Sequence, residues 1–354
     1  MSKALKNKKN KENISKKILS ILQKKGFNFI DLDIVIDTDL LTRRSGEAFK
    51  KYALNFKDKS GKEISLRPDL TIATAIQYIQ RKKKGTEKLS YFGSAFRLNK
   101  KGDLQVFDQI GCEIINSKSS PEYLILSTIL PVFKTLKKKQ IILNDIGLFD
   151  NLIYSLNLPK RWKLRLIRHY SRKEYFDELL NRLDTNYDLD NEKIKIDYNR
   201  LKDLKKMDVN KVIGGRTVAE IIERFEKKIK DPRDNFNGSQ SVKIIKDFLK
   251  LKVPLKKSAD IIKNFIEKND LKIKNLNQVL LKLNKLNKKL GTKQDVIFDA
   301  KFGRETQYYT GLAFSICKQN KELARGGEYN NLIKTLGGKQ TSAFGAAINL
   351  NQLI

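Results

Sequence analysis

The stretch that decides the fold is residues 89–116, which read LSYFGSAFRLNKKGDLQVFDQIGCEIIN. Two extended segments flank a polar turn, and this arrangement predicts an antiparallel hairpin. On the second segment the side chains alternate, so that Gln109, Gly111 and Glu113 face one side of the sheet. The opposite side is apolar and suits a core. Because a glycine between two polar residues leaves the backbone open, the hairpin predicts a ligand site on its polar face.

Other segments with strand or helix signals lie on both sides of this hairpin. We expect extended segments at Leu54–Phe56, Ile64–Leu66, Leu89–Phe96, Gln105–Ile115, Val296–Ala300 and Tyr308–Ile316, and helices over about 13–26, 69–80 and 329–336. Gly326 and Gly327 are expected to form the turn that opens the last of these helices. Antiparallel hairpins favour an α+β fold over a doubly wound one.

The character of the sequence changes twice along the chain. Helical spacing dominates between residues 151 and 290, as at Leu276 and Leu280. Lysines crowd the first twelve residues, which we expect to be a basic, flexible tail. The predicted organisation is this tail over 1–12, a first part of the core over 13–150, a mainly helical insert over 151–290 and a second part of the core over 291–354.

The chain carries 73 Lys and Arg against 40 Asp and Glu, which gives a formal charge of +33. Such a charge suits a nucleic-acid partner, because clustered cations release counterions from phosphates. Only 16 of these cations are Arg, and the lysines are spread over the whole chain among Asn and Ile. We therefore favour a solvated, lysine-rich surface, and nucleic acid is not an expected partner.

Composition excludes several other classes of protein. The one histidine, His169, excludes sites built from several histidines, and the two distant cysteines, Cys112 and Cys317, exclude a CxxC motif. We expect no metal ion and no cofactor. A P-loop nucleotidase is excluded because the GxxxxGK[ST] pattern is absent. No apolar stretch is long enough to span a bilayer and the N-terminus lacks a signal region, so we expect a cytoplasmic protein.

Four polar segments, far apart in the sequence, lie on predicted strands or at the ends of elements. They are Leu66–Thr71 (LRPDLT), Tyr91–Arg97 (YFGSAFR), Gln109–Glu113 (QIGCE) and Arg304–Gly311 (RETQYYTG), the last followed by Gly326–Tyr329 (GGEY). On one face of a sheet, the carboxylates would take an ammonium group, an arginine would pair with a carboxylate and tyrosines would form walls. Alone, each segment reads as an ordinary helix start, turn or core strand. Together they predict a site for a zwitterion.

In the same order, these segments resemble the catalytic core of histidyl-tRNA synthetase, a class II synthetase. The first looks like its LRPEGT, the second like motif 2, the third like QxGxE and the fourth like RGLDYYTG, with GGRYDxL matching the segment from Gly326. The resemblance covers about 14–115 and 298–354, and it implies an antiparallel sheet flanked by helices with a helical insertion. Carried over residue by residue, it implies a histidine pocket of Asp69, Thr71, Arg97, Gln109, Glu113, Arg304, Tyr308, Tyr309 and Tyr329.

The positions that would contact ATP depart from the synthetase. Motif 2 reads FRxE there and Phe96-Arg-Leu-Asn99 here, which replaces a carboxylate by an amide. Motif 3 ends with an arginine that clamps the triphosphate, and the matching position is Gln352. Loss of that cation removes electrostatic stabilisation during adenylate formation. The sequence stops two residues after Gln352, so the resemblance implies no anticodon-binding domain.

A chain that keeps an amino-acid pocket and lacks nucleotide contacts resembles the regulatory-subunit family of ATP phosphoribosyltransferase. The members of that family are paralogues of the synthetase. This resemblance implies a subunit without catalytic residues, which the short catalytic subunit requires for activity and for histidine feedback inhibition in the first step of histidine biosynthesis. It also implies L-histidine as effector, a hetero-oligomer with the catalytic subunit, and a homodimer through the motif 1 region, about Phe27–Leu41. Two alternatives stay open: a minimal histidyl-tRNA synthetase-like adenylating enzyme, and a tRNA- or RNA-binding synthetase paralogue.

Overall fold

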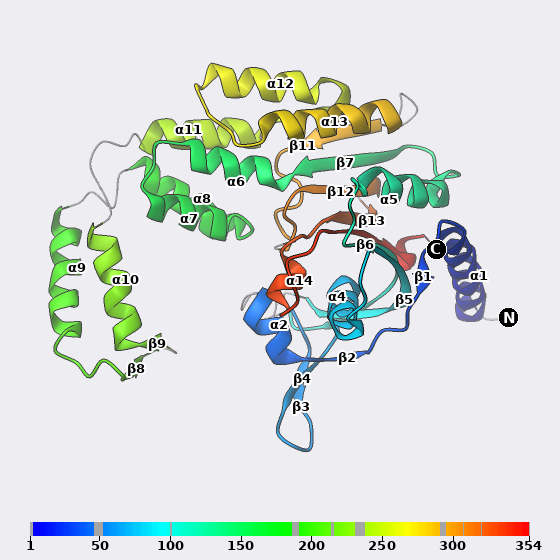
Figure 1. Cartoon of the computed structure of the whole chain (residues 1–354), viewed down its shortest axis with the longest axis horizontal. Coiled ribbons are helices and arrows are strands. Elements are labelled where there is room, and N and C mark those ends of the chain that lie inside the picture. Colours follow the sequence, from blue (N-terminus) through cyan, green and yellow to red (C-terminus); the bar gives the residue numbers. More distant parts are fainter. Residues whose placement is uncertain are drawn as a thin grey trace. The chain divides into compact units, whose positions relative to one another are not determined.

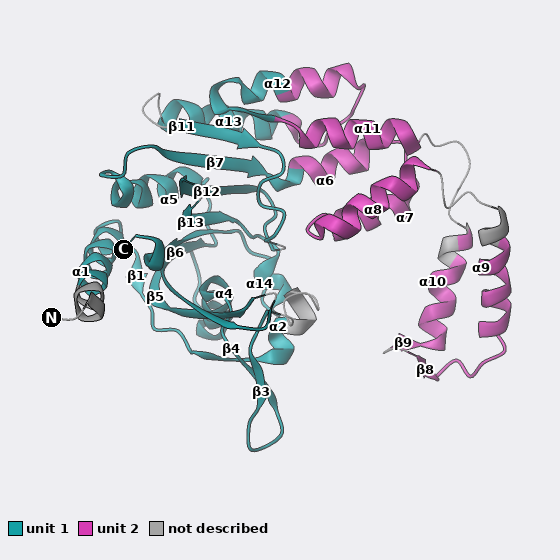
Figure 2. Cartoon of the chain, turned by 180° about the vertical axis from the view of Figure 1, so that it is seen from behind, with its two compact units in different colours: residues 1–147, 252–261, 277–354 teal, residues 148–251, 262–276 magenta. Residues whose placement is uncertain are grey.

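The computed structural model describes residues 3–45, 52–99, 101–185, 191–213, 216–230, 238–290, 295–306, 308–319 and 321–353. The chain falls into two compact units (Figure 2). The core unit comprises residues 1–147, 252–261 and 277–354, and the helical unit comprises residues 148–251 and 262–276. The chain therefore leaves the core unit twice and returns to it twice.

A large mixed sheet forms the centre of the core unit (Figure 1). Its strands occur in the order β1 (Asn28–Phe29), β5 (Glu87–Leu98), β6 (Leu104–Ile115), β14 (Ala343–Asn349), β13 (Lys321–Glu328), β12 (Leu312–Lys318), β7 (Lys139–Asp145), β11 (Asp295–Asp299) and β10 (Lys252–Pro254). Most neighbours pair antiparallel, whereas β1 with β5 and β7 with β11 run parallel. On β6, Glu113 pairs with Leu89 on one side and with Gly345 on the other.

A three-stranded sheet and several helices complete the core unit. The sheet has the order β2 (Val35–Asp37), β4 (Glu63–Leu66) and β3 (Asn55–Lys57). The helices are α1 (Lys3–Lys24), α2 (Thr38–Ser45), α4 (Leu70–Arg81), α5 (Glu122–Ile129), α14 (Leu332–Thr335) and nearly all of α13 (Leu276–Leu290), with 3-10 turns η1 (Leu130–Phe133) and η3 (Leu350–Gln352). Leu70 and Ile72 of α4 belong to the same buried apolar cluster as Leu89 and Tyr91 of β5, so α4 is fixed beside the hairpin.

The helical unit is built around aromatic side chains. Its elements are α6 (Ile146–Ser155), α7 (Lys160–His169), α8 (Lys173–Asp184), α9 (Asn191–Leu204), α10 (Val218–Lys230) and α11 (Gly238–Leu249), with a short ladder of β8 (Val212–Ile213) and β9 (Arg216–Thr217); α12 (Leu255–Lys268) is shared between the units. Phe149 stacks on Tyr170 with ring centroids 3.8 Å apart, and Trp162 is fully buried. Within the described part of the chain, no helix has the length and apolar character needed to cross a membrane.

The predicted α+β class is confirmed, and so are two hairpins: the one that joins the extended segments Leu54–Phe56 and Ile64–Leu66, and the one over 89–116. The first hairpin corresponds to β3 and β4, and the second to β5 and β6. The helix predicted over 69–80 is α4. Period-2 alternation and polar turns are strong local signals, which is why these elements were readable without tertiary information.

The turn predicted at Gly326 and Gly327 is wrong, because both residues lie inside β13. A β-carbon on Gly326 would lie 2.4 Å from the carbonyl oxygen of Gly345 and 2.7 Å from the ring of Phe314. The glycine therefore serves close packing within the sheet and does not form a turn. The short helix that follows begins at Leu332, three residues later than predicted.

Two further segments differ from the predicted organisation. Residues 3–12, predicted to be a flexible tail, are part of α1, and Lys11 forms an ion pair with Asp108 on β6. Residues 252–254, which lie within the range of the predicted insert, form β10 at the edge of the large sheet. A three-residue strand is too short to carry a periodic signal, so helical periodicity alone placed it in the insert.

Candidate ligand-binding site

Glu113 lies at the centre of a buried hydrogen-bond network on the polar face of β6. Its side chain is fully buried. Its Oε1 accepts hydrogen bonds from Thr71 Oγ1 at 2.9 Å and Tyr91 Oη at 3.0 Å, and its Oε2 accepts one from Tyr329 Oη at 2.6 Å. Burial raises the pKa of Glu113 to about 7, although the three hydroxyl donors favour the charged form. The site therefore holds a carboxyl group that exchanges a proton near neutral pH.

Two glycines make room for this network. A β-carbon on Gly345 would lie 1.4 Å from Glu113 Oε2, and one on Gly111 would lie 2.1 Å from Tyr91 Oη. The space above Gly111, which the sequence predicted to be open for a ligand, is thus filled by the ring of Tyr91. Sequence reasoning left Tyr91 out of the site. Its position opposite Gly111 on the paired strand was the signal that could have identified it.

Asp69 forms the second polar centre of the site. Its Oδ1 accepts the backbone N–H groups of Thr71 at 2.8 Å and Ile72 at 3.2 Å, so it is the N-cap of α4. Its Oδ2 accepts hydrogen bonds from Nη2 of Arg97 at 3.2 Å and from the hydroxyl of Tyr308 at 3.2 Å. The helix start predicted for this segment is therefore confirmed, whereas the part of the same carboxylate in ligand binding stays a prediction.

Arg97 is held in place from two further directions. Its Nε donates to the carbonyl oxygen of Pro68 at 2.7 Å, and its guanidinium lies 5.8 Å from the ring centroid of Phe107. The guanidinium is therefore anchored to the protein backbone through Nε while its Nη2 meets Asp69. A preformed pair of opposite charges is the arrangement that a zwitterion satisfies, because such a ligand brings a counter-charge for each member.

Three tyrosines form an aromatic wall beside these groups. Tyr308 meets Tyr309 and Tyr329 edge to face, with ring centroids 5.2 and 6.2 Å apart. Tyr309 packs against Gly327, where a β-carbon would lie 2.9 Å from its ring. Burial raises the pKa of Tyr308 and of Tyr329 well above the usual range, so both phenols are neutral donors at physiological pH.

The structure places most of the predicted pocket residues in one connected network. Asp69, Thr71, Arg97, Glu113, Tyr308, Tyr309 and Tyr329 are joined by hydrogen bonds or ring contacts. Gln109 lies half-buried on β6, paired with Gly93 and Asn349. Arg304 lies half-buried in the turn between β11 and β12. Their part in ligand binding stays a prediction, as does that of the network.

The two positions that distinguish the chain from an ATP-binding synthetase lie away from this network. Asn99 closes the turn between β5 and β6, where its Oδ1 accepts the backbone N–H groups of Lys101 at 2.8 Å and Asp103 at 2.9 Å. Its amide Nδ2 donates to Asp103 Oδ2 at 3.0 Å. Gln352 is exposed at the end of η3. Neither position provides the charge that triphosphate binding needs.

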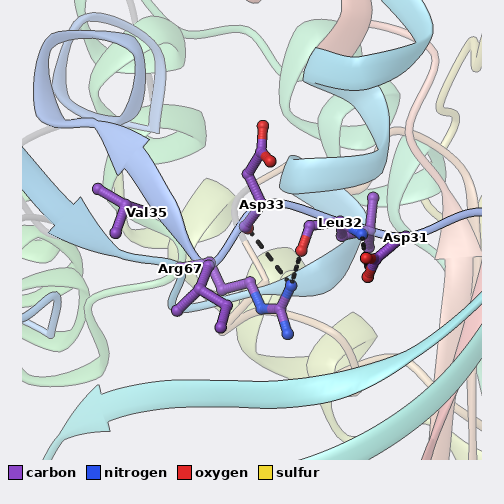
Figure 3. A pocket seen from close by; sticks show the side chains of 6 residues that line it. Asp31, Leu32, Asp33, Val35 and Arg67 are labelled. Atoms are coloured by element: carbon purple, nitrogen blue, oxygen red, sulfur yellow. Dashed lines mark hydrogen bonds between the residues drawn. The ribbon is translucent and has the colours of Figure 1, made fainter.

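A groove whose lining residues are close in sequence to Asp69 is organised by Arg67 (Figure 3). It is lined by Asp31, Leu32, Asp33, Ile34, Val35 and Arg67. Arg67 Nη1 donates to the carbonyl oxygens of Leu32 and, at 3.3 Å, of Asp33, while its Nε donates to Ser94 at 2.8 Å. Burial lowers the pKa of Arg67, but a guanidinium remains charged. This arginine therefore ties the predicted motif 1 region to the strand that carries Tyr91 and Arg97.

No metal site is evident in the described ranges, since they contain no group of three His, Cys, Asp or Glu side chains suited to hold an ion. The two cysteines, Cys112 and Cys317, are both free. Burial raises the pKa of each thiol, which leaves both in the unreactive protonated form.

Comparison with known proteins places these features in one family. The family model described as histidyl-tRNA synthetase matches residues 4–353. The ATP phosphoribosyltransferase regulatory subunit of Mesorhizobium japonicum is 24% identical over 351 residues, which cover 92% of each chain. The protein of the same name from Brucella ovis is 25% identical over 332 residues, which cover 87% of each chain.

Solved structures share the fold over nearly the whole chain. A protein from Bacillus halodurans, described as an ATP phosphoribosyltransferase regulatory subunit/histidyl-tRNA synthetase, aligns with a TM-score of 0.66 at 17% identity and covers 98% of this chain and 78% of that one. A chain of the ATP phosphoribosyl transferase (HisG:HisZ) complex from Thermotoga maritima aligns with a TM-score of 0.54 at 18% identity. The alignment covers 95% of this chain and 96% of that one. Because the family model spans almost every residue, the chain belongs to the histidyl-tRNA synthetase family.

Proposed function

We propose that the chain is the regulatory subunit of an ATP phosphoribosyltransferase. Curated relatives that carry this name match the chain over most of their length and most of its own. We propose that it contributes no catalytic residues of its own, and we place it in the cytoplasm with the short catalytic subunit as its partner. The shared fold with a chain of the HisG:HisZ complex supports a hetero-oligomer.

We further propose that L-histidine is the effector and that it binds beside Asp69 and Glu113. One observation carries this proposal: the groups suited to a free amino acid form a buried network, whereas the two positions expected to contact ATP hold neutral amides. Asp69 would take the ammonium group and Arg97 the carboxylate, each exchanging its present partner for the ligand. The tyrosine wall suits a flat imidazole ring.

Feedback inhibition then requires a difference in histidine affinity between two states of the complex. Histidine shifts the equilibrium only if it binds the inhibited state more tightly than the active one. The coupling is reciprocal, so a ligand of the catalytic subunit that favours the active state must weaken histidine binding by the same factor.

Replacing Asp69 by Ser is expected to weaken histidine binding about tenfold, because it removes a charged hydrogen-bond acceptor. Serine is also a good N-cap, so α4 keeps its first turn and the loss reports on the carboxylate alone. Calorimetry with the purified complex measures the affinity, and a transferase assay measures the histidine concentration that gives half inhibition. Asp103→Ser, the same chemical change at an exposed position in the turn between β5 and β6, is the control. Unchanged inhibition in Asp69→Ser would place histidine sensing elsewhere in the assembly.

The adenylating alternative makes the opposite prediction in a simple assay. With Asn99 and Gln352 in place of charged residues, we expect histidine-dependent ATP–pyrophosphate exchange at background level. Turnover above background would restore the synthetase hypothesis. The RNA-binding alternative predicts tRNA binding at physiological ionic strength that weakens steeply with salt, and we expect no such binding.

We also propose a homodimer through the motif 1 region. In that region Ile34 and Val35 are 51% and 44% exposed, and nearby strands carry the exposed apolar residues Phe92 and Val106. Apolar side chains gathered on a folded surface mark interfaces. Sedimentation of Val35→Asp is expected to give a smaller species than the unaltered chain. Leu281→Asp, an exposed apolar residue on α13, is the control, and equal sedimentation of all three would exclude this interface.

A further inference from the structure

A lysine on α13 is surrounded by three carboxylates from three different elements. Lys282 Nζ lies 3.2 Å from Glu328 Oε2 at the end of β13 and 3.3 Å from Glu122 Oε1 in the first turn of α5. It lies 4.0 Å from Asp145 Oδ2 at the end of β7. All four residues belong to the core unit. One cation thus links three elements, and it offsets the repulsion among the carboxylates that these elements carry.

The cluster is largely buried, so its charges interact strongly. The side chains of Asp145 and Glu122 are only 5% and 7% exposed. Burial raises the pKa of Asp145 to about 6. Desolvation lowers the pKa of Lys282, but attraction by the three carboxylates outweighs it and the net pKa is raised. Removal of Lys282 would therefore leave several partly buried negative charges without a counter-charge.

Glu328 connects this cluster to the aromatic wall of the candidate site. It directly precedes Tyr329, and its backbone carbonyl accepts the N–H of Thr310 at 2.8 Å. Its Oε1 accepts the side-chain amide of Asn330 at 2.6 Å. A β-carbon on Gly311 would lie 2.7 Å from its carboxylate, so the backbone at Gly311, at the end of the Tyr308–Gly311 segment, packs directly on this side chain. The position of Glu328 therefore affects both sides of the tyrosine wall.

We propose that Lys282 is a positioning residue for the ligand site, which acts through Glu328 to hold Tyr329 and the Tyr308–Gly311 segment in their binding geometry. Lys282 is remote from the ligand groups and belongs to α13, a helix that sequence analysis assigned to the insert. The effect on histidine affinity rests on the proposed function. The effect on the geometry of Tyr329 does not.

The first test is calorimetry of L-histidine binding to the full chain. Lys282→Met is expected to weaken binding about tenfold, and Lys282→Arg, which keeps the charge, is expected to restore it. Lys285→Met makes the same chemical change at an exposed position of α13 and should bind as the unaltered chain does. Equal affinity of Lys282→Met and Lys285→Met would overturn the proposal.

A double variant covers the case in which Lys282→Met fails to fold. In Lys282→Met/Glu328→Gln one cation and one carboxylate are removed together, so the net charge of the cluster stays as in the unaltered chain and less stability should be lost than in Lys282→Met. If Lys282 positions the wall through Glu328, this variant still binds histidine less tightly than the unaltered chain. Full recovery of affinity would mean that Lys282 serves only to neutralise charge, and would overturn the proposal.

A second measurement needs no ligand. With 3-fluorotyrosine at position 329, the fluorine resonance reports the surroundings of that ring. We expect it to move in Lys282→Met and in the double variant, and to stay in place in Lys285→Met and Lys282→Arg. An unmoved resonance in all four variants would overturn the proposal. If the unaltered chain fails to bind histidine, the proposed function falls, and the resonance alone decides the role of Lys282.

Discussion

Replacement of Glu113 by Ala is expected to lower the free energy of unfolding by about 3 kcal/mol, because three buried hydroxyl groups lose their acceptor at about 1 kcal/mol each. Those hydroxyls belong to Thr71, Tyr91 and Tyr329, which come from α4, β5 and the end of β13. The change removes the one group that joins these three elements, so histidine binding should be lost as well. Chemical denaturation measures the first effect and calorimetry the second.

Glu113→Gln is the matched variant, because it keeps the size of the side chain and removes its charge. The amide oxygen still accepts two hydrogen bonds, but the amide nitrogen cannot accept the one from Tyr329, which must rotate to become an acceptor. We expect a smaller loss of stability than in Glu113→Ala. A loss below about 1 kcal/mol in Glu113→Ala would mean that the network is not a stabilising feature.

Comparison of the unaltered chain with Glu113→Gln tests the protonation of Glu113. Its pKa is about 7 in the folded chain against 4.5 for the free side chain, so between these values the folded state binds more protons than the unfolded state. The contribution of Glu113 to stability is therefore highest at low pH and falls by up to about 3 kcal/mol as pH rises from 4.5 to 7. Asp145 contributes a similar fall in stability as pH rises from 3.8 to about 6.

Glu113→Gln should remove the first of these contributions and leave the second. The two proteins should therefore differ in slope most clearly between pH 4.5 and about 7, where folded Glu113 keeps a proton that the unfolded chain releases, whereas Asp145 contributes equally to both. Thermal unfolding at closely spaced pH values measures this slope. Parallel curves across that window would show that Glu113 is not protonated near neutral pH.

The sequence was most informative where the signal is local. Alternation on 89–116 placed Glu113 on the polar face, and the Arg-Pro-Asp segment placed Asp69 at a helix start, because strand alternation and capping depend on neighbours along the chain. The joint occurrence of four polar segments then predicted which side chains come together. That inference needed no distances, only the assumption of a common sheet face.

The sequence was least informative where partners are distant and the signal is steric. QIGCE alone does not indicate that Tyr91 fills the space above Gly111, because that signal lies in the pairing of Tyr91 with Gly111 across the hairpin. Nothing near Gly326 distinguishes a packed strand from a turn. Lys282 is one of many lysines on a helical stretch, and its three carboxylate partners lie 46 to 160 positions away in sequence. Such residues become visible only when the fold brings their partners together.

Replacement of Gly345 by Ala is expected to be as damaging as the loss of Glu113, and for a related reason. The added methyl group would lie 1.4 Å from Glu113 Oε2 and 2.9 Å from the carbonyl oxygen of Cys112, so Glu113 must move and the strands must separate. Such overpacking costs about 3 kcal/mol. Histidine binding should be lost with it, because the displaced carboxylate no longer accepts from Tyr329.

A double variant distinguishes this steric explanation from general damage to β14. If the methyl group acts by displacing Glu113, then Gly345→Ala adds little to a chain that already carries Glu113→Ala, since the clashing side chain is gone. Gly147→Ala is the control for the added methyl group, because its nearest neighbour is a side-chain oxygen of Asp145 at 3.1 Å and the residue lies in α6, where Ala is favoured over Gly. Additive losses in the double variant, measured by chemical denaturation, would show that Gly345 is needed for the strand pairing itself and not for the placement of Glu113.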